Sequence, residues 1–313
     1  MKVSVLVMTY NHINFIAQAL DSVLMQQVDF DYEILISEDC STDGTRAVVT
    51  DYQRRFPEKI RLLLSEQNIR SNQVVVRGIR AAKGDYIALL DGDDYWISPE
   101  KLQKQVEYLE RHPECSMCFH NAKVVYEDAS RDSWNWTPAH QKEISTLDDL
   151  WMGNFIATCS TMLRREPLED IPDWYDAFFP ITDWPLYILS AEHGKIGYIN
   201  EVMGVYKYHS GGLYSPFSEA QKLEQTLAFY QTINANLNFK YDKIIKTAIS
   251  KYFFEWAEEY EKRGLPEQGK ACFQRYLSSQ PINPFIPISH ALKVWLKLYL
   301  PQLVNGKKPI NCL

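Results

Sequence analysis

Three carboxylates lie close together at the end of one apolar segment. Asp91, Asp93 and Asp94 directly follow the apolar run Tyr86–Leu90. Like charges this close raise one another's pKa, and a divalent cation removes that penalty. Oxygen ligands suit Mn²⁺ or Mg²⁺, and an ion held by few protein ligands completes its coordination shell with substrate phosphates. The pattern predicts a metal-dependent site for a diphosphate; the alternative is a solvated turn, because Asp-Gly is a common turn pair.

Two earlier apolar segments also end in polar residues. The run Thr9–Asn11 follows Lys2–Met8, and the acidic run Glu38–Thr45 follows Tyr32–Ser37. In open α/β sheets, ligands bind beyond the carboxyl ends of the strands. We therefore expect both runs to meet Asp91–Asp94 at one edge of a sheet.

The spacing of apolar residues predicts the elements that carry these runs. Short apolar runs alternate with helical periodicity, which is typical of an α/β fold with a Rossmann-like, mostly parallel sheet and helices on both faces. We expect strands over Lys2–Met8, Tyr32–Ser37, Ile60–Leu64, Tyr86–Leu90, Cys115–Tyr126, Ile156–Leu163 and Lys195–Tyr208, and helices over residues 15–24, Thr45–Phe56, Gln73–Ala82, from Pro99 onwards and over Trp184–His193.

After about residue 215 the pattern becomes helical. We expect helices over Glu219–Asn234, Lys243–Arg263 and Pro266–Ser279, and domains at 1–215 and 216–313. The last two of these helices resemble one tetratricopeptide repeat, a helix–turn–helix unit. Because stable arrays of that repeat need about three copies and one is present, we expect a single helical hairpin packed on the main domain.

The composition is that of an ordinary globular protein. Hydrophobic residues make up 46% of the 313 residues and charged residues 23%, with a formal net charge of -7. Nucleic-acid binding is disfavoured, because neutralising phosphates needs a basic surface and no long Lys/Arg run is present. The first residues lack a signal-peptide pattern, no apolar run reaches the roughly 18 residues that span a bilayer, and the scattered cysteines suit reduced thiols. We expect a cytoplasmic protein.

Four motifs in register resemble family 2 glycosyltransferases over roughly the first 215 residues. They are Thr9-Tyr10-Asn11, Glu38-Asp39-x-Ser41-x-Asp43-Gly44-Thr45, Gly84-Asp85-Tyr86 and Asp91-x-Asp93-Asp94-x-Trp96. The resemblance implies the GT-A fold and an inverting transfer of a sugar from a nucleotide-diphosphate-sugar donor, most often a UDP-sugar, to an acceptor hydroxyl. The acceptor implied is a glycan or a lipid-linked sugar, in polysaccharide or other surface-glycan synthesis.

The resemblance also assigns the donor nucleotide to particular residues. Tyr10 would stack on the base, with Thr9 and Asn11 beside it. Asp39 would hydrogen-bond the base, and Arg77 stands where a basic residue could meet the nucleotide.

The diphosphate is assigned in the same way. Asp91 would contact the ribose, and Asp93 would hold the metal that bridges the two phosphates. His209, in a segment that resembles the one closing over the donor, would ligate the metal or touch a phosphate, although a lone His is as often structural. Asp94 is a further possible metal or phosphate contact.

Asp183 corresponds to the general base of the family. It would accept the proton of the acceptor hydroxyl as that oxygen attacks the anomeric carbon. The family has a second acidic residue before this base, whereas Thr182 stands here, which leaves acceptor recognition open. Asp also caps helices well, so a purely structural cap before Trp184 is the alternative.

Two segments have more than one interpretation. The polar loop Glu127–Glu143 contains Trp134, Trp136 and His140, which would contact the acceptor or pack as an aromatic loop. The segment Ser289–Leu300 has a broad apolar face and two lysines four residues apart. It would lie peripherally on a membrane or pack on the preceding hairpin.

The rival from another class is a non-catalytic module with the sugar-nucleotide fold that binds partners through its helical tail. A nicotinamide dehydrogenase or a sugar-nucleotide pyrophosphorylase is disfavoured, because each needs a glycine-rich loop after the first strand. The residues Thr9–His12 stand there instead, without a glycine.

Overall fold

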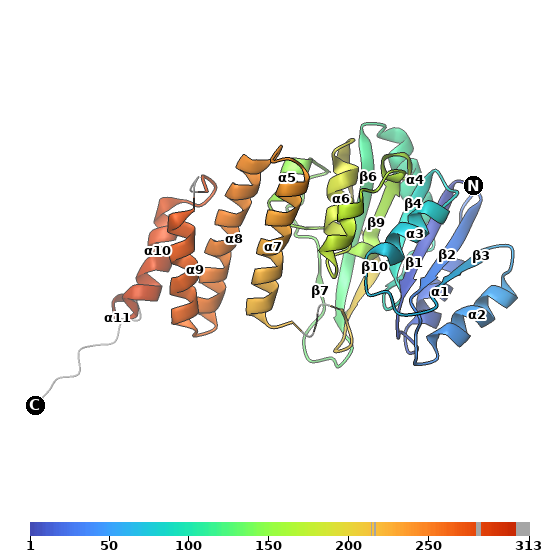
Figure 1. Ribbon diagram of the computed structural model, residues 1–313, viewed down its shortest axis with the longest axis horizontal. Helices are drawn as coiled ribbons and strands as arrows, with labels where there is room; N and C mark the ends of the chain where they lie inside the picture. Colours follow the sequence, from blue (N-terminus) through green and yellow to red (C-terminus); the bar gives the residue numbers. More distant parts are fainter. Residues whose placement is uncertain (214, 216, 280–282, 305–313) are drawn as a thin grey trace, which may run out of the picture. The chain divides into compact units, whose positions relative to one another are not determined.

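The computed structural model describes residues 1–213, 215, 217–279 and 283–304, and its chain forms two compact units. We call residues 1–150 and 154–216 the sheet unit, and residues 151–153 and 217 onwards the helical unit. Figure 1 shows the strands of the first and the helices of the second.

The sheet unit is built on a ten-stranded mixed sheet. Its strands are β1 (Val3–Thr9), β2 (Tyr32–Glu38), β3 (Ile60–Leu64), β4 (Tyr86–Asp91), β5 (Tyr95–Trp96), β6 (Cys115–Tyr126), β7 (Trp134–Asn135), β8 (Ile144–Ser145), β9 (Thr161–Arg164) and β10 (Lys195–Tyr208). The order is β3-β2-β1-β4-β9-β6-β10-β5, with β7 paired to β6 and β8 to β10. The predicted fold class, an α/β sheet followed by a helical region, is confirmed.

The first strand places the carboxyl ends of its neighbours together. β1 runs parallel to β2 and β4, pairing Thr9 with Glu38 and Met8 with Asp91. Every residue of β1 and β2 is buried, as is typical of strands covered on both faces. The segments that follow these strands therefore begin at one edge of the sheet, as the motif spacing predicts.

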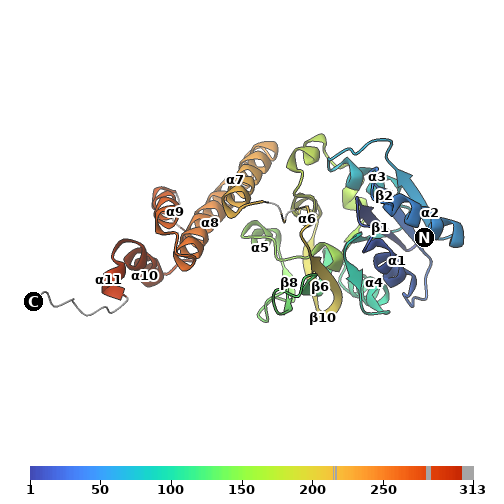
Figure 2. The same ribbon diagram turned by 90° about the horizontal axis from the view of Figure 1, so that it is seen from below.

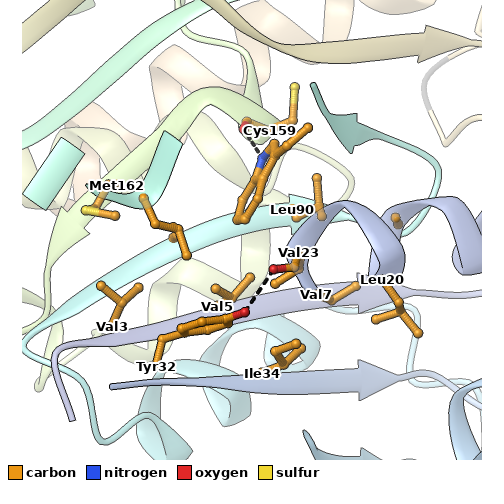
Figure 3. Packing of buried hydrophobic residues seen from close by; sticks show 14 of the residues in the cluster. Val3, Val5, Val7, Leu20, Val23, Tyr32, Ile34, Leu90, Cys159 and Met162 are labelled. Atoms are coloured by element: carbon orange, nitrogen blue, oxygen red, sulfur yellow. Dashed lines mark hydrogen bonds between the residues drawn. The ribbon is translucent and has the colours of Figure 1, made fainter. Parts of the chain in front are cut away.

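Helices cover both faces of the sheet. They are α1 (Ile16–Leu24), α2 (Thr45–Arg55), α3 (Gln73–Ala81), α4 (Lys101–Arg111) and α6 (Asp183–Ala191), whereas the short helix α5 (Leu147–Trp151) ends where the chain first enters the helical unit. α1 and α4 lie on one side of β1 and α3 on the other (Figure 2). Beneath α1, Val5 and Tyr32 belong to the buried core, and the Tyr32 hydroxyl donates to the Val23 carbonyl at 3.1 Å (Figure 3).

The strand predicted over Ile156–Leu163 is wrong in its first half. Thr158–Ser160 form a 3-10 helix, and β9 begins only at Thr161. The hydroxyls of Ser160 and Thr161 both donate to the Ala157 carbonyl, at 2.7 and 3.3 Å, so this turn competes with extended backbone. β9 then runs antiparallel between β4 and β6, a pairing that apolar spacing alone does not show.

The helix predicted from Pro99 begins at Lys101 instead. The reason is a distant side chain, Gln26, whose Oε1 accepts from Leu102 N at 3.0 Å and whose Nε2 donates to Ser98 O at 2.8 Å. Gln26 therefore satisfies backbone groups at the start of α4, which a local capping rule assigns to a residue beside the helix.

The cysteines carry free thiols in the described part of the chain. They are Cys40, Cys115, Cys118, Cys159 and Cys272, and Cys312 lies outside the described residues. Cys115 and Cys118 are both buried in β6, where desolvation raises the pKa of the thiols to about 11 and about 12. These are properties of inert structural thiols.

The helical unit consists of helices packed around aromatic rings. They are α7 (Glu219–Asn236), α8 (Asp242–Lys262), α9 (Pro266–Ser278), α10 (Ile288–Tyr299) and α11 (Pro301–Val304). Phe254 of α8 lies 6.2 Å from Phe273 and 5.1 Å from Tyr276 of α9, measured between ring centroids. A Cβ atom at Gly269 would lie 3.2 Å from the Ala257 carbonyl oxygen, so the glycine lets α9 approach α8 closely. Among the described residues, none of the helices combines the length and apolar character needed to cross a membrane.

Candidate active site

A glycine allows the ends of β1 and β4 to approach each other closely. Gly92 follows Asp91, the last residue of β4, and its amide donates to Met8 O at 2.7 Å. A Cβ atom at Gly92 would lie 2.7 Å from Thr9 Oγ1 and 2.9 Å from His12 Nδ1. A residue without a side chain is therefore required where these two strand ends meet.

Asp93, just beyond this glycine, faces two imidazoles. His209 Nε2 lies 2.9 Å and His12 Nε2 3.6 Å from Asp93 Oδ2. Burial opposes ionisation of Asp93, but the two histidines hold the pKa of this carboxyl below its ordinary value. The structure thus brings together Asp93 and His209, the two residues predicted to hold a metal, from positions 116 residues apart.

Asp91 lies in a region of surplus negative charge. Burial, and then the charges of Asp93 and Asp183, raise the pKa of Asp91 to about 8. We call these three residues the carboxylate cluster. Acidic groups perturbed in this way are characteristic of sites that bind a cation or handle a proton. Asp91 and Asp183, predicted as ribose contact and general base, therefore belong to one site although they come from β4 and α6.

Asp183 is held at the first turn of α6. Its Oδ1 accepts from Trp184 N at 2.7 Å, and its Oδ2 accepts from Asn154 Nδ2 at 2.9 Å. Burial raises the pKa of Asp183, and these two hydrogen bonds only partly oppose the shift. A carboxylate with a raised pKa is a stronger base, so the bond to the helix amide and a role in proton transfer are compatible.

The loop after β1 leaves Tyr10 accessible to a ligand. The Tyr10 side chain is 39% exposed, whereas Thr9 is buried. Asn11 adopts a left-handed backbone with φ of 55°, which Asn tolerates better than most residues. Its Oδ1 accepts from Thr42 N and its own amide donates to Ser41 Oγ, both at 2.9 Å. Asn11 therefore fixes the loop that presents Tyr10.

Asp39 organises the segment after β3. Its Oδ1 accepts from Ser65 Oγ at 2.9 Å and from Ile69 N at 3.0 Å, and its Oδ2 accepts from Arg70 N at 3.3 Å. A carboxylate has about four acceptor positions, so one oxygen still has capacity for a further donor. The predicted hydrogen bond from a nucleotide base to Asp39 is compatible with this arrangement.

Arg77 supports Asp39 indirectly. Its Nη1 donates to Ser65 Oγ at 2.6 Å, and its Nε donates to Ser37 Oγ at 2.7 Å. Its Nη2 donates to Glu38 O at 3.0 Å. These bonds use three of the five guanidinium N–H donors, so a contact between Arg77 and the nucleotide would use the remaining two and stays a prediction.

Asp94 lies in the protein interior. The residue is 2% exposed, and its Oδ1 accepts from Lys207 N at 2.8 Å. Burial, with the charges of Asp93 and Asp91, raises the pKa of Asp94 well above its ordinary value. Asp94 ties the turn after β4 to β10, and the structure gives its possible contact with a metal or phosphate no support.

Three further residues near this site were not predicted from the sequence. His12 directly follows the first motif, and its place next to Asn11 was the available signal. Asn154 binds Asp183 from 29 residues away and carries no local signal. Tyr206, in β10, has its pKa raised first by burial and then by the charges of Asp94 and Asp93.

The residues present fit a divalent cation that is completed by a substrate. Carboxylate and imidazole are ligands that Mn²⁺ accepts, and the cluster has negative charge to offset. Within the described ranges, no group of three or more His, Cys, Asp or Glu side chains has the geometry to hold a metal by itself. Asp93 and His209 would therefore supply only part of a coordination shell, and phosphate oxygens would supply the rest.

Comparisons with known sequences agree with these motifs. Residues 4–172 match the family model described as Glycosyl transferase family 2. The chain is 33% identical over 291 residues to the uncharacterized protein Rv1520 of Mycobacterium tuberculosis, covering 92% of this chain and 83% of the relative. It is 32% identical over 168 residues to TuaG of Bacillus subtilis, a glycosyltransferase assigned to teichuronic acid biosynthesis, covering 52% of this chain and 62% of the relative.

Solved structures share the fold at low identity. TarS of S. aureus (residues 1–349), in complex with UDP-GlcNAc, superposes with a TM-score of 0.64 at 17% identity, covering 99% of this chain and 93% of TarS. The mannosyltransferase PcManGT of Pyrobaculum calidifontis, in complex with GDP-Man and Mn²⁺, superposes with a TM-score of 0.57 at 18% identity, covering 97% and 82%.

Proposed function

The chain belongs to glycosyl transferase family 2 and is a glycosyltransferase, and from this premise we propose that it transfers a sugar from a nucleotide-diphosphate-sugar donor to an acceptor hydroxyl with inversion. The observation that carries the proposal is the carboxylate cluster, in which Asp93 meets His209 next to Asp91 and Asp183. The cluster offers a place for a diphosphate and a base within one site.

The donor proposed is a UDP-sugar. The exposed Tyr10 ring would stack on the base, with Thr9 and Asn11 shaping the loop and Asp39 accepting a hydrogen bond from the base. Asp91 would contact the ribose. The TarS complex contains UDP-GlcNAc and supports this choice, whereas the PcManGT complex contains GDP-Man and supports the alternative base.

The metal proposed is Mn²⁺ or Mg²⁺, held by Asp93 and His209. A bound divalent cation supplies a Lewis acid that takes up charge on the departing diphosphate. The imidazole favours Mn²⁺, because Mg²⁺ prefers oxygen ligands alone. The Mn²⁺ in the PcManGT complex supports the same choice.

Asp183 is the base that we propose for the transfer. Its raised pKa and its two hydrogen bonds, from Trp184 N and Asn154 Nδ2, would hold a basic oxygen in one place. That oxygen would take the proton of the acceptor hydroxyl as the new glycosidic bond forms and the bond to the diphosphate breaks. Attack from the face opposite the leaving group inverts the anomeric carbon.

Cell-surface glycan synthesis is the process that the relatives support. TuaG is assigned to teichuronic acid biosynthesis, and a 23% identical relative over 265 residues is a chondroitin synthase of Pasteurella multocida. We propose a glycan or a lipid-linked sugar as the acceptor.

Nucleotide release separates this proposal from a non-catalytic binding module. The wild-type protein would be incubated with UDP-GlcNAc, UDP-glucose or GDP-mannose, with Mn²⁺, Mg²⁺ or EDTA, and free UDP or GDP would be measured. We expect slow hydrolysis of one donor that Mn²⁺ supports and EDTA abolishes. Tight binding of all these donors by thermal shift, without turnover of any, would favour the binding module.

A further inference from the structure

Three aromatic side chains, from β7, the residue after it and β10, lie in a row on either side of β6. Trp134 in β7 pairs with Val124 in β6, and Val124 pairs with Tyr206 in β10. Paired residues point to the same face of a sheet, and so does Trp136, two residues along from Trp134. We call Trp134, Trp136 and Tyr206 the aromatic row.

Ring contacts make the row continuous. The rings of Trp134 and Trp136 are stacked, with centroids 6.0 Å apart and planes inclined by 13°. The centroid of Trp136 lies 5.2 Å from that of Tyr206, with an interplanar angle of 52°. Both distances are typical of favourable aromatic pairs.

The inner end of the row lies beside the carboxylate cluster. The residue after Tyr206 is Lys207, whose amide donates to Asp94 Oδ1 at 2.8 Å. His209, one residue beyond the end of β10, binds Asp93 Oδ2. The end of β10 that carries Tyr206 therefore also contacts Asp93, within the cluster, and Asp94, next to it in the chain.

The outer end of the row is open to solvent on an ordered backbone. Trp134 is 48% exposed, which is unusual for so large an apolar side chain. The segment is nevertheless fixed, because Trp136 N donates to Ala122 O at 2.8 Å and Thr137 N donates to Asn121 Oδ1 at 2.9 Å. A rigid, accessible ring loses little conformational entropy when it binds a ligand.

We propose that the aromatic row is the binding platform for a carbohydrate acceptor, an inference that rests on the proposed function. Pyranose rings present faces of C–H groups that pack on aromatic rings, while their hydroxyls remain hydrogen-bonded. Tyr206 receives the sugar whose hydroxyl reacts, and Trp136 and Trp134 stack on sugars farther along the chain. The acceptor class is therefore a glycan of several sugars, not a single monosaccharide.

The test measures oligosaccharide binding by the full-length protein with UDP and Mn²⁺ present. The probes are N-acetylchitohexaose, cellohexaose and maltohexaose, and the binding of each is measured by calorimetry. We expect at least one hexasaccharide to bind, and Trp134→Ala to weaken that binding about 10-fold, which corresponds to the roughly 1.4 kcal/mol of a good aromatic contact. Trp134→Phe should restore most of the affinity, and the matching monosaccharide should bind weakly to both proteins.

Controls separate this inference from the proposed function. Trp295→Ala removes one ring of the stacked Trp295–Tyr299 pair in the helical unit and should leave oligosaccharide binding unchanged. Donor hydrolysis and UDP binding should be normal in Trp134→Ala; their absence from the wild type would instead remove the proposed function. The platform is overturned if no hexasaccharide binds the wild type, if Trp134→Ala binds equally well, or if Trp134 supports binding to phosphatidylglycerol vesicles instead of glycans.

Discussion

The sheet unit and the helical unit differ in the kind of buried polar group that lacks a hydrogen-bond partner. Among the described residues, each unit has buried side-chain atoms without a hydrogen-bond partner. In the sheet unit these include atoms of ionisable residues: His12 Nδ1, Asp94 Oδ2, Lys101 Nζ and His120 Nε2. In the helical unit they belong to neutral groups: Trp151 Nε1, Gln225 Oε1, Asn234 Oδ1 and Ser250 Oγ.

This difference indicates where the fold carries a cost in stability. Burial without a partner favours the neutral form of an ionisable group, so it raises the pKa of Asp94 and lowers the pKa of Lys101. Such shifts destabilise the fold at a pH where the unfolded chain carries the charge. The helical unit avoids that cost and packs aromatic rings, with its ion pairs at the surface, such as Lys246 with Asp242 and Arg263 with Glu259. We therefore expect substitutions of charged groups to alter chemistry in the sheet unit and to have small effects in the helical unit.

The substitution with the largest expected effect, at Asp93, tests whether a charged group of the sheet unit is needed for activity. Asp93→Ala should reduce donor turnover about 1000-fold, because metal-assisted departure of the diphosphate is worth several kcal/mol. The fold should survive, because one of several like charges is removed. The measurements are Mn²⁺-dependent donor hydrolysis and the melting temperature with and without Mn²⁺.

The matched control is Asp85→Ala, an exposed aspartate just before the other end of β4. It should retain wild-type turnover and Mn²⁺ affinity. If Asp93→Ala also retains both, the metal assignment is wrong.

A smaller loss is expected at the proposed base. Asp183→Asn should lower turnover about 100-fold while UDP binding stays near normal, as expected when a general base is lost. Asn keeps an oxygen that can accept from Trp184 N, so the start of α6 is preserved. Steady-state turnover and UDP titration would be measured together.

Asn154→Ala tests whether the hydrogen bond to Asp183 contributes to turnover. It removes the donor to Asp183 Oδ2 but leaves the carboxylate, so it should reduce turnover less and shift the pH at which activity rises. A variant Asp183→Asn that melts earlier yet turns over at the full rate would identify Asp183 as a structural cap only.

The pH dependence of stability tests, without any substrate, whether the sheet unit buries an ionisable group that has no partner. Lys101 is fully buried, its ammonium lies 3.8 Å from the centroid of the Trp96 ring, and burial lowers its pKa to about 7. The unfolded chain keeps this proton up to about pH 10 and the folded chain releases it near pH 7, so this group's contribution makes stability rise with pH over that window. Lys101→Met should remove the rise and increase stability at pH 7.

Urea unfolding at pH 7 and pH 9.5 measures this effect. Lys104→Met is the control on the same helix, because Lys104 is paired with Glu100 and Glu201 near the surface and does not share the lowered pKa. Equal pH dependence in the wild type and in Lys101→Met would contradict the buried, unpaired state of Lys101.

The sequence predicts those parts of the site that depend on single strands. The runs after β1, β2 and β4 could be placed at one edge because parallel strands align their carboxyl ends, and the roles of Asp93 and His209 were implied by the family resemblance. Lys101 could not be predicted as buried, since lysine is rarely enclosed without a partner. Gln26 at α4 and Asn154 at Asp183 depend on contacts between distant segments, which local propensity does not encode. The three hydrogen bonds of Arg77 to Ser37, Ser65 and Glu38 depend on such contacts too.

The apolar face predicted for Ser289–Leu300 is divided in the structure. Val294 and Leu298 are buried in the core of the helical unit, as the packing alternative predicts. Ile288 and Leu292 remain 88% and 55% exposed. Lys297 is paired with Glu261 at 3.1 Å, which reduces the charge available to a lipid surface, and Lys307 and Lys308 lie outside the described residues.

The smallest expected effect concerns this remaining exposed face. We propose weak, salt-reversible membrane contact through Ile288 and Leu292. Moving each exposed apolar side chain out of water is favourable. With Lys297 paired, one lysine of the segment is left, and its attraction to anionic lipid contributes roughly 1 kcal/mol to binding. Replacing both with Ser should lower co-sedimentation with phosphatidylglycerol vesicles about threefold at low salt and change donor hydrolysis little. Leu277→Ser, a half-exposed leucine on α9, is the control and should pellet as the wild type does. Equal, negligible pelleting of all three proteins would show that the exposed face of α10 does not bind a lipid surface and that α10 contributes only to the packing of the helical unit.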